Sequence, residues 1–190
     1  MLKKKIKRLV ALLKTKFLYN FGSVGKRAVV YKPIQIDSPC NVELGDFSTI
    51  YDFCWLIVSN KKGKIVIGDH SVIGHFAHIV AESKVTIENH VLVADKVFIS
   101  DCTHNYENVN IPILAQGISV KKSIVIGEGS WLGENVCVCG ASIGKHCIIG
   151  ANSVVTNDIP NYSVAVGAPA KVIKKYDFST KKWIYSINKT

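Results

Sequence analysis

The sequence predicts an all-β repeat fold, a coil of short strands preceded by one helix. Two observations support this prediction. An aliphatic residue recurs every six positions through most of the chain, and a polar excursion near residue 110 interrupts that period before it resumes. A period of six fits neither the 3.6-residue period of a helix nor the two-residue period of a strand in an ordinary sheet. It indicates short strands joined by tight corners around a shared core.

The N-terminal segment, residues 1–30, predicts an amphipathic helix and a lead-in to the coil. Its apolar residues stand three or four positions apart, with basic residues between them: Leu2, Ile6, Leu9, Val10, Leu13 and Phe17. This spacing makes one apolar stripe on a helix. Two interpretations stay open. The stripe lies on a membrane surface through residues 1–20, or it covers the open end of the coil while the lysines face water.

Composition favours one domain with a continuous core, because 48% of the 190 residues are hydrophobic. The formal charge of +10 favours acidic partners in general, and we expect no nucleic acid among them. The apolar run Leu9 to Leu13 ends at Lys14, so we expect neither a signal peptide nor a membrane span and predict a cytoplasmic protein. None of the six cysteines forms a C-x-x-C pair, and we expect them to be buried filler.

The coil itself is predicted over residues 31–174. Its core positions are Ile67, Ile73, Ile79, Ile87, Val93, Ile99, Ile126, Leu132, Val138, Ile143, Ile149 and Val155. Glycine often follows the aliphatic residue, as in Ile143-Gly144, and we expect it there because it tolerates the backbone angles of tight corners. A small or β-branched residue stands four places on, a position that Cys147 and Ser153 occupy.

The main break in the repeat begins at Asp101-Cys102-Thr103-His104-Asn105-Tyr106, and the period resumes at Ile124. A loop carries side chains that a packed coil cannot accommodate, so chemistry in a repeat protein concentrates where the repeat is broken. We therefore predict a protruding active-site loop over residues 105–123.

An ordered set of motifs resembles one known family. The motifs are Asp-x-x-His at 101–104, Ile-Gly-Glu-Gly-Ser-Trp-Leu-Gly at 126–133, Ile-Ile-Gly-Ala-Asn-Ser-Val-Val-Thr at 148–156 and Val-Gly-Ala-Pro-Ala-Lys-Val-Ile-Lys at 166–174. The set is similar to the hexapeptide-repeat acetyltransferases, in particular those that modify maltose, galactosides and the sugars of capsule or O-antigen. This resemblance implies a left-handed parallel β-helix, a hand that the spacing alone does not supply.

The resemblance also implies a reaction, transfer of an acetyl group from acetyl-CoA to a hydroxyl or amine of a sugar. The acceptor is a cell-surface polysaccharide or a nucleotide-linked amino sugar, and no metal is expected. His104 matches the family's catalytic histidine, and imidazole titrates near neutral pH as a general base must. Asp101 either orients that imidazole or bonds its own loop as a corner aspartate. We interpret Cys102 as filler, because the family transfers the acetyl group directly.

The resemblance places acetyl-CoA along the coil between neighbouring subunits of a homotrimer. Trp131 then lines the pantetheine arm, Ala151 offers backbone contacts, Thr156 lies near the adenine, and the phosphates meet lysines of the C-terminal motif. Those lysines are Lys171 and Lys174, which otherwise only solvate that face. Where the repeat lacks one residue, Gly140 and Ala141 are candidate backbone donors to the oxyanion. The acceptor candidates are His75, Asn105 and Tyr106.

Two other functions remain open at this stage. His75-x-x-His78 has ligand spacing, which fits a zinc enzyme on the same coil, like the γ-class carbonic anhydrases. A non-catalytic scaffold coil is the second alternative, and it predicts no CoA binding. Residues 175–190, which include Phe178 and Trp183, are expected to form a short helical segment packed on the assembly.

Overall fold

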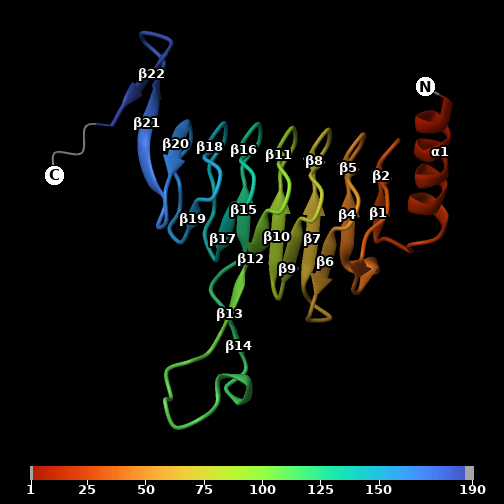
Figure 1. The fold of residues 1–190 in the computed structure, drawn as a ribbon, viewed down its shortest axis with the longest axis horizontal. Helices are drawn as coiled ribbons and strands as arrows, with labels where there is room; N and C mark the ends of the chain where they lie inside the picture. Colours follow the sequence, from red (N-terminus) through yellow and green to blue (C-terminus); the bar gives the residue numbers. More distant parts are fainter. Residues whose placement is uncertain (1, 187–190) are drawn as a thin grey trace.

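The computed structural model describes residues 2–186, which form a prism of stacked coils with one helix, α1 (Leu2–Phe17), across one end (Figure 1). Three sheets form its sides, and the fold is a left-handed parallel β-helix. Residues 1 and 187–190, at the ends of the predicted terminal segments, lie outside the described residues.

The strands of successive coils pair in parallel within each sheet. Sheet A contains β1 (Ser23–Val24), β4 (Val42–Leu44), β7 (Lys64–Ile67), β10 (Lys84–Ile87) and β15 (Ile124–Ile126). Sheet B contains β2 (Val29–Val30), β5 (Thr49–Ile50), β8 (Val72–Ile73), β11 (Leu92–Val93), β16 (Trp131–Leu132), β18 (Ile148–Ile149), β20 (Ser163–Val166), β21 (Lys171–Asp177) and β22 (Lys182–Tyr185). Sheet C contains β3 (Gln35–Ile36), β6 (Trp55–Val58), β9 (His78–Ala81), β12 (Phe98–Ser100), β17 (Cys137–Cys139) and β19 (Val154–Val155). A short 3-10 turn, η1 (Pro39–Asn41), precedes β4.

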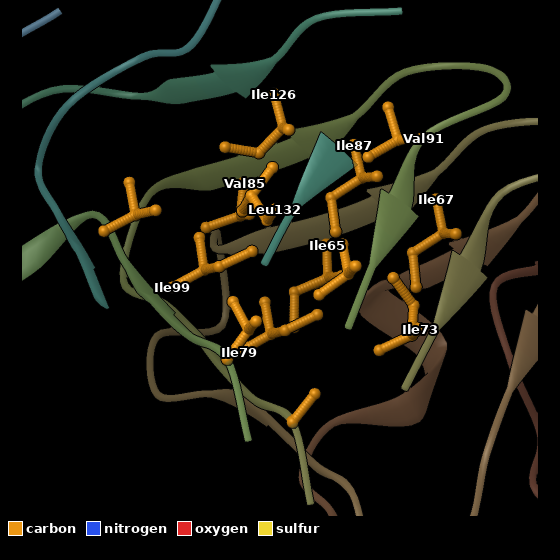
Figure 2. Close-up of a cluster of buried hydrophobic side chains, with 14 of the residues drawn as sticks. Ile65, Ile67, Ile73, Ile79, Val85, Ile87, Val91, Ile99, Ile126 and Leu132 are labelled. Atoms are coloured by element: carbon orange, nitrogen blue, oxygen red, sulfur yellow. The ribbon is translucent and has the colours of Figure 1, made fainter. Parts of the chain in front are cut away.

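The repeat positions form the core of the prism. All of the predicted aliphatic positions from Ile67 to Val155 expose 1% of their surface or less. Figure 2 shows several of them, among them Ile73, Ile99 and Leu132, pointing from different strands into the same interior. Burying each such side chain contributes about 1.5–3 kcal/mol, so the stacked column of aliphatic residues holds the sides of the prism together. Cys147 is fully buried at its small position, as predicted. The expectation that all six cysteines are buried is wrong, because Cys40 is exposed and Cys102, Cys137 and Cys139 are only partly buried.

Glycine follows the aliphatic residue at the corners for a different reason from the predicted one. The positive φ of the corner falls three places after the aliphatic residue, for example at His70 (φ 57°) and Asn152 (φ 60°). Gly74 directly follows an aliphatic residue, and a Cβ built there would lie 2.5 Å from the carbonyl carbon of Ala94 in the next coil. The glycine after the aliphatic residue therefore allows adjacent coils to approach closely, and it does not supply a left-handed backbone.

Helix α1 packs on β2 through its small, polar side. Ala11 and Thr15 are buried there, and the Thr15 hydroxyl accepts a hydrogen bond from Val30 N–H (2.8 Å) and donates one to the Ala11 carbonyl (2.8 Å). The apolar stripe stays outside, with Leu2 and Phe17 70% and 73% exposed. The interpretation that the stripe covers the coil end is therefore wrong. Within residues 2–186, no helix has the length and apolar character needed to cross a membrane.

Both boundaries of the coil differ from the predicted ones. The first coil begins at β1, before the predicted start at Tyr31, because its short strands carry too few aliphatic repeats to be recognised. The predicted C-terminal helical segment is wrong. The chain turns at Gly167 (φ 100°), and β21 and β22 add an antiparallel hairpin to the edge of sheet B. The hairpin contains aromatic and β-branched residues, which favour strands.

Candidate active site

The break in the repeat forms a hairpin that projects from the prism (Figure 1). Its stem pairs β13 (Cys102–His104) with β14 (Ile118–Val120) in antiparallel fashion, and a 3-10 turn, η2 (Ile113–Ala115), lies near its tip. Asn105 closes the stem, because its N–H donates to the Gly117 carbonyl (3.1 Å) and its side-chain amide donates to the Gln116 carbonyl (3.0 Å). Asn105 is thus a structural residue of the hairpin, and it fixes the backbone directly beside His104.

His104 lines a pocket of about 350 Å³ between the hairpin stem and the outer face of sheet C. The rest of the wall comes from Ser59, from outward side chains of β9, β12 and β17, and from the hairpin itself: His78, Val80, Phe98, Ser100, Cys102, Thr103, Ile118, Lys121 and Cys139. Burial lowers the pKa of His78, which favours its neutral form in this wall. Sequence reasoning missed most of this wall. The available signal was the outward alternation of strand residues, as at Phe98 and Ser100.

Asp101 does not orient His104. Its side chain is fully buried, and its carboxylate accepts hydrogen bonds of 2.8 Å from the backbone N–H groups of Glu82, Ser83 and Lys84. These amides form the corner between β9 and β10 on the preceding coil. All side-chain hydrogen bonds of Asp101 in the described part of the chain go to these three groups. Of the two roles predicted for Asp101, the structure thus supports that of a corner aspartate and not that of a carboxylate that orients His104. Asp101 anchors the root of the hairpin.

The predicted oxyanion donors lie at the same edge of sheet C as the hairpin. Gly140 N–H donates to the Ser100 carbonyl (2.8 Å), so this group is already committed to the coil and the prediction for Gly140 is wrong. Ala141 is buried, with 1% of its surface exposed. The Lys121 side chain packs over Gly140, where a built Cβ would collide with Lys121 Cδ. The absence of a side chain at Gly140 therefore leaves room for Lys121, which lines the His104 pocket.

The predicted CoA residues lie on separate surfaces of one chain. Trp131 projects from sheet B, 48% exposed, and pairs in register with Leu92 and Ile148. Ala151 lies at the corner between β18 and β19, in a separate hollow of about 400 Å³. Thr156 directly follows β19, at the edge of sheet C from which the hairpin leaves. Of these three, Thr156 is on the hairpin side, and none of the three is among the residues that line the His104 pocket.

The two predicted phosphate lysines belong to the C-terminal hairpin. Lys171 is exposed on β21 and pairs with Val166. Lys174 is half-buried, and its Nζ lies 4.4 Å from the centre of the Tyr185 ring, a cation–π contact. Lys174 is therefore engaged within the hairpin, which leaves Lys171 the more accessible of the two.

The remaining acceptor candidates do not lie together. His75 occupies the corner before β9, its Nδ1 is 3.2 Å from Asp95 Oδ1, and its ring stacks on Tyr51. The strands of sheet C are parallel, so the corner before β9 and the hairpin after β12 lie at opposite edges of that sheet. Tyr106, 64% exposed, lies on the hairpin beyond the stem. Within one chain, His75 and His104 therefore lie at opposite edges of sheet C.

The thiols near the pocket are not activated. Burial raises the pKa of Cys102, whose Sγ lies 3.4 Å from Ser100 Oγ. Burial raises the pKa of Cys137 to about 12, and its Sγ lies 3.4 Å from that of Cys139. A thiol with a raised pKa is protonated at neutral pH and is a poor nucleophile. This geometry agrees with the interpretation of Cys102 as filler.

The histidines of the predicted zinc spacing have separate surroundings. His75 contacts Tyr51 and Asp95, whereas His78 packs between Trp55 and Phe98. Within residues 2–186, no three His, Cys, Asp or Glu side chains converge in an arrangement that would hold a metal ion.

The sequence of this chain is similar to those of known transferases. A family model described as "Bacterial transferase hexapeptide (six repeats)" matches residues 123–157. The chain is 40% identical over 129 residues to a putative lipopolysaccharide biosynthesis O-acetyl transferase, WbbJ, of Escherichia coli K12, covering 64% of this chain and 66% of that one. It is 34% identical over 141 residues to a galactoside O-acetyltransferase of Lactococcus lactis, covering 72% and 67%.

A solved structure shares the fold over nearly the whole chain. It is AntD, an N-acyltransferase from Bacillus cereus in complex with dTDP and 3-hydroxybutyryl-CoA, with a TM-score of 0.73 at 18% identity, covering 94% of this chain and 90% of that one. The aligned part of this chain spans 66%, 43% and 56% of the length of three curated relatives that it matches.

Proposed function

Because the chain belongs to the hexapeptide-repeat acetyltransferase family, we propose that it transfers an acetyl group from acetyl-CoA to a hydroxyl or amine of a sugar. The sequence relatives named as O-acetyltransferases favour a hydroxyl acceptor, and the lipopolysaccharide relative favours a cell-surface polysaccharide such as O-antigen. The proposal includes a cytoplasmic enzyme, with acetyl-CoA as co-substrate and no metal.

The accessibility of His104 is the observation on which this proposal rests. Its imidazole lies in the pocket wall, and within residues 2–186 it makes no hydrogen bond to another side chain. A ring nitrogen is therefore available to a substrate. The apolar wall that Phe98, Val80 and Ile118 provide excludes part of the water from the same space.

In the proposed reaction, His104 removes the proton from the acceptor hydroxyl as its oxygen attacks the thioester carbonyl carbon. A C–O bond forms, and the negative charge moves to the carbonyl oxygen of a tetrahedral intermediate. That intermediate collapses, the C–S bond breaks, and the imidazolium returns its proton to the CoA sulfur. No group of the enzyme is acylated, which agrees with the protonated thiol of Cys102.

The separation of the predicted groups supports a homotrimer in which each site lies between two subunits. His75 and Ala151 lie at the edge of sheet C opposite His104, and Trp131 lies on sheet B. A closed ring presents one side of each prism to a different side of its neighbour, which brings such groups together. We therefore propose that acetyl-CoA lies between neighbouring chains, with its pantetheine arm along Trp131 and its adenine near Thr156.

Release of free CoA thiol from acetyl-CoA tests the proposal, with a panel of sugars and nucleotide-linked amino sugars as acceptors. We expect His104→Asn to lower kcat/KM by about 10²–10⁴-fold while CoA binding, measured by calorimetry, is retained. His90→Asn is the matched control, because His90 is an exposed histidine in a corner that tolerates asparagine.

Two results would contradict the proposal in different ways. Full activity of His104→Asn would show that His104 is not the general base, while the proposed acetyl transfer would stand. No thiol release and no CoA binding by the unmodified protein would instead favour the scaffold or the zinc enzyme, which metal analysis of the purified protein separates.

A further inference from the structure

Helix α1 presents an apolar face that the fold leaves uncovered. Ala11 and Thr15 point toward β2 and are buried. Successive residues of a helix turn by about 100°, so Leu2, Leu9 and Leu13 lie on the side opposite these two residues. Their exposed fractions are 70%, 58% and 53%. The same face includes Ile6 and Phe17, which makes a continuous apolar stripe along the whole helix.

The charge around this stripe favours an anionic partner. Leu2–Phe17 contains no Asp or Glu and seven basic residues: Lys3, Lys4, Lys5, Lys7, Arg8, Lys14 and Lys16. Lys7 is engaged by Asp52 on the coil (2.8 Å), on the docked side of the helix. Lys5 and Lys16 flank the stripe and are exposed. A second copy of this helix would bring like charges together, whereas anionic lipid headgroups complement them.

The position of the helix makes the stripe accessible to a flat surface. Figure 1 shows α1 lying across the end of the prism, with the C-terminal hairpin at the other end and the β13–β14 hairpin projecting sideways. The outward face of α1 is thus an end of the molecule. A groove of about 160 Å³ lies where the helix meets the coil, and its lining combines Lys7, Lys14 and Lys32 with Val10, Ala11 and Tyr31.

We propose that α1 attaches this protein to an anionic bilayer as a membrane-surface helix. The apolar stripe enters the boundary between headgroups and acyl chains, and the flanking lysines bind phosphate groups of the lipids. The proposal goes beyond the acetyltransferase reaction, because none of the α1 residues lines the His104 pocket. It also accounts for the inverted docking of the helix, which buries alanine and threonine and leaves leucines in solvent.

Co-sedimentation of the full chain with vesicles tests this proposal. The vesicles contain either phosphatidylcholine with phosphatidylglycerol or phosphatidylcholine alone. The double variant Leu9→Gln/Leu13→Gln removes two apolar side chains without changing the charge. The double variant Lys5→Gln/Lys16→Gln removes two charges beside the stripe. Lys61→Gln/Lys62→Gln removes the same charge from an exposed turn of the coil and is the matched control.

We expect the unmodified protein and the control to bind the anionic vesicles, and to bind pure phosphatidylcholine about tenfold or more weakly. The leucine variant should lose about tenfold or more of its vesicle affinity. The lysine variant should lose several-fold and depend less on salt. Circular dichroism, thermal melting and thiol release in solution should be unchanged in all variants, which separates attachment from folding and from the proposed catalysis.

Three outcomes would overturn the proposal. In the first, the leucine variant retains full vesicle binding. In the second, the unmodified protein fails to bind anionic vesicles. In the third, light scattering shows that the particle mass doubles and that Leu9→Gln/Leu13→Gln abolishes the doubling without any vesicle binding. The stripe would then be an interface between copies of the chain.

Discussion

Replacing Asp101 by asparagine distinguishes a structural carboxylate from a catalytic one. The carboxylate is fully buried and accepts from three backbone N–H groups at 2.8 Å, two of them, those of Ser83 and Lys84, on the same oxygen. An asparagine side chain has one acceptor oxygen and one NH₂ group. Whichever way it is turned, the NH₂ group faces at least one backbone N–H donor, so a buried hydrogen bond is lost and a donor is left without a partner.

The cost follows from these contacts. A hydrogen bond to a charged group contributes about 1.5–3 kcal/mol, and a buried donor without a partner costs a comparable amount. In the orientation that loses one of these bonds and leaves its donor without a partner, the two terms add, and we expect Asp101→Asn to lower the free energy of unfolding by roughly 3–6 kcal/mol. For a chain of this size that corresponds to a fall in Tm of roughly 6–24 °C.

Thermal melting and thiol-release kinetics below the melting range measure the two effects separately. We expect a large fall in Tm and a modest fall in kcat, because Asp101 anchors the hairpin root and does not contact His104. Asp158→Asn is the control. Asp158 pairs with Lys122 on the surface, so this substitution should lower Tm far less than Asp101→Asn does. A fall in kcat of about 10⁴-fold with an unchanged Tm is the behaviour of an orienting carboxylate and would refute this reasoning.

Three further predictions follow from packing and protonation. Gly74→Ala should destabilise the protein by about 1–3 kcal/mol in denaturant, because its Cβ would meet the next coil at 2.5 Å; an unchanged midpoint would mean that the coils separate freely. The hydrogen bond from Lys122 lowers the pKa of Asp158 from its usual 3.8, so this pair stabilises the hairpin above about pH 4 and is lost as pH falls through the lowered pKa. Proteolysis of the hairpin should therefore accelerate in acid, and Asp158→Asn should remove that acceleration. Burial raises the pKa of Cys54 to about 11, so iodoacetamide at about pH 8 should label exposed Cys40 and spare Cys54, which peptide mass spectrometry measures.

The coil was predictable because its signal is local and periodic. One residue in six, from Ile67 to Val155, marks both the strand and its inward direction, and no long-range information is needed. The first coil lacked this signal, because β1 and β2 are two residues long. The C-terminal hairpin also lacked it, since its strands pair with an edge whose position depends on the completed coil.

The hairpin of the candidate site was predictable from the sequence, and the contacts within that site were less so. The break in the period identifies the hairpin that contains His104. The partners of Asp101 lie 17 to 19 residues earlier, on the preceding coil, and are backbone amides that no side-chain motif reveals. Similarly, Gly140 N–H is committed to Ser100 because β12 and β17 pair across the insertion, a register that the sequence does not display.

The strands before and after the hairpin pair directly with each other, so the coil does not depend on the hairpin. Val85 pairs with Ile124 and Phe98 pairs with Cys137, so the coil continues in register as if residues 101–123 were absent. Changes of length or sequence beyond the anchored root therefore leave the column of aliphatic residues untouched. The hairpin can therefore change while the repeat keeps the fold stable, so the proposed acceptor site can be altered without rebuilding the coil.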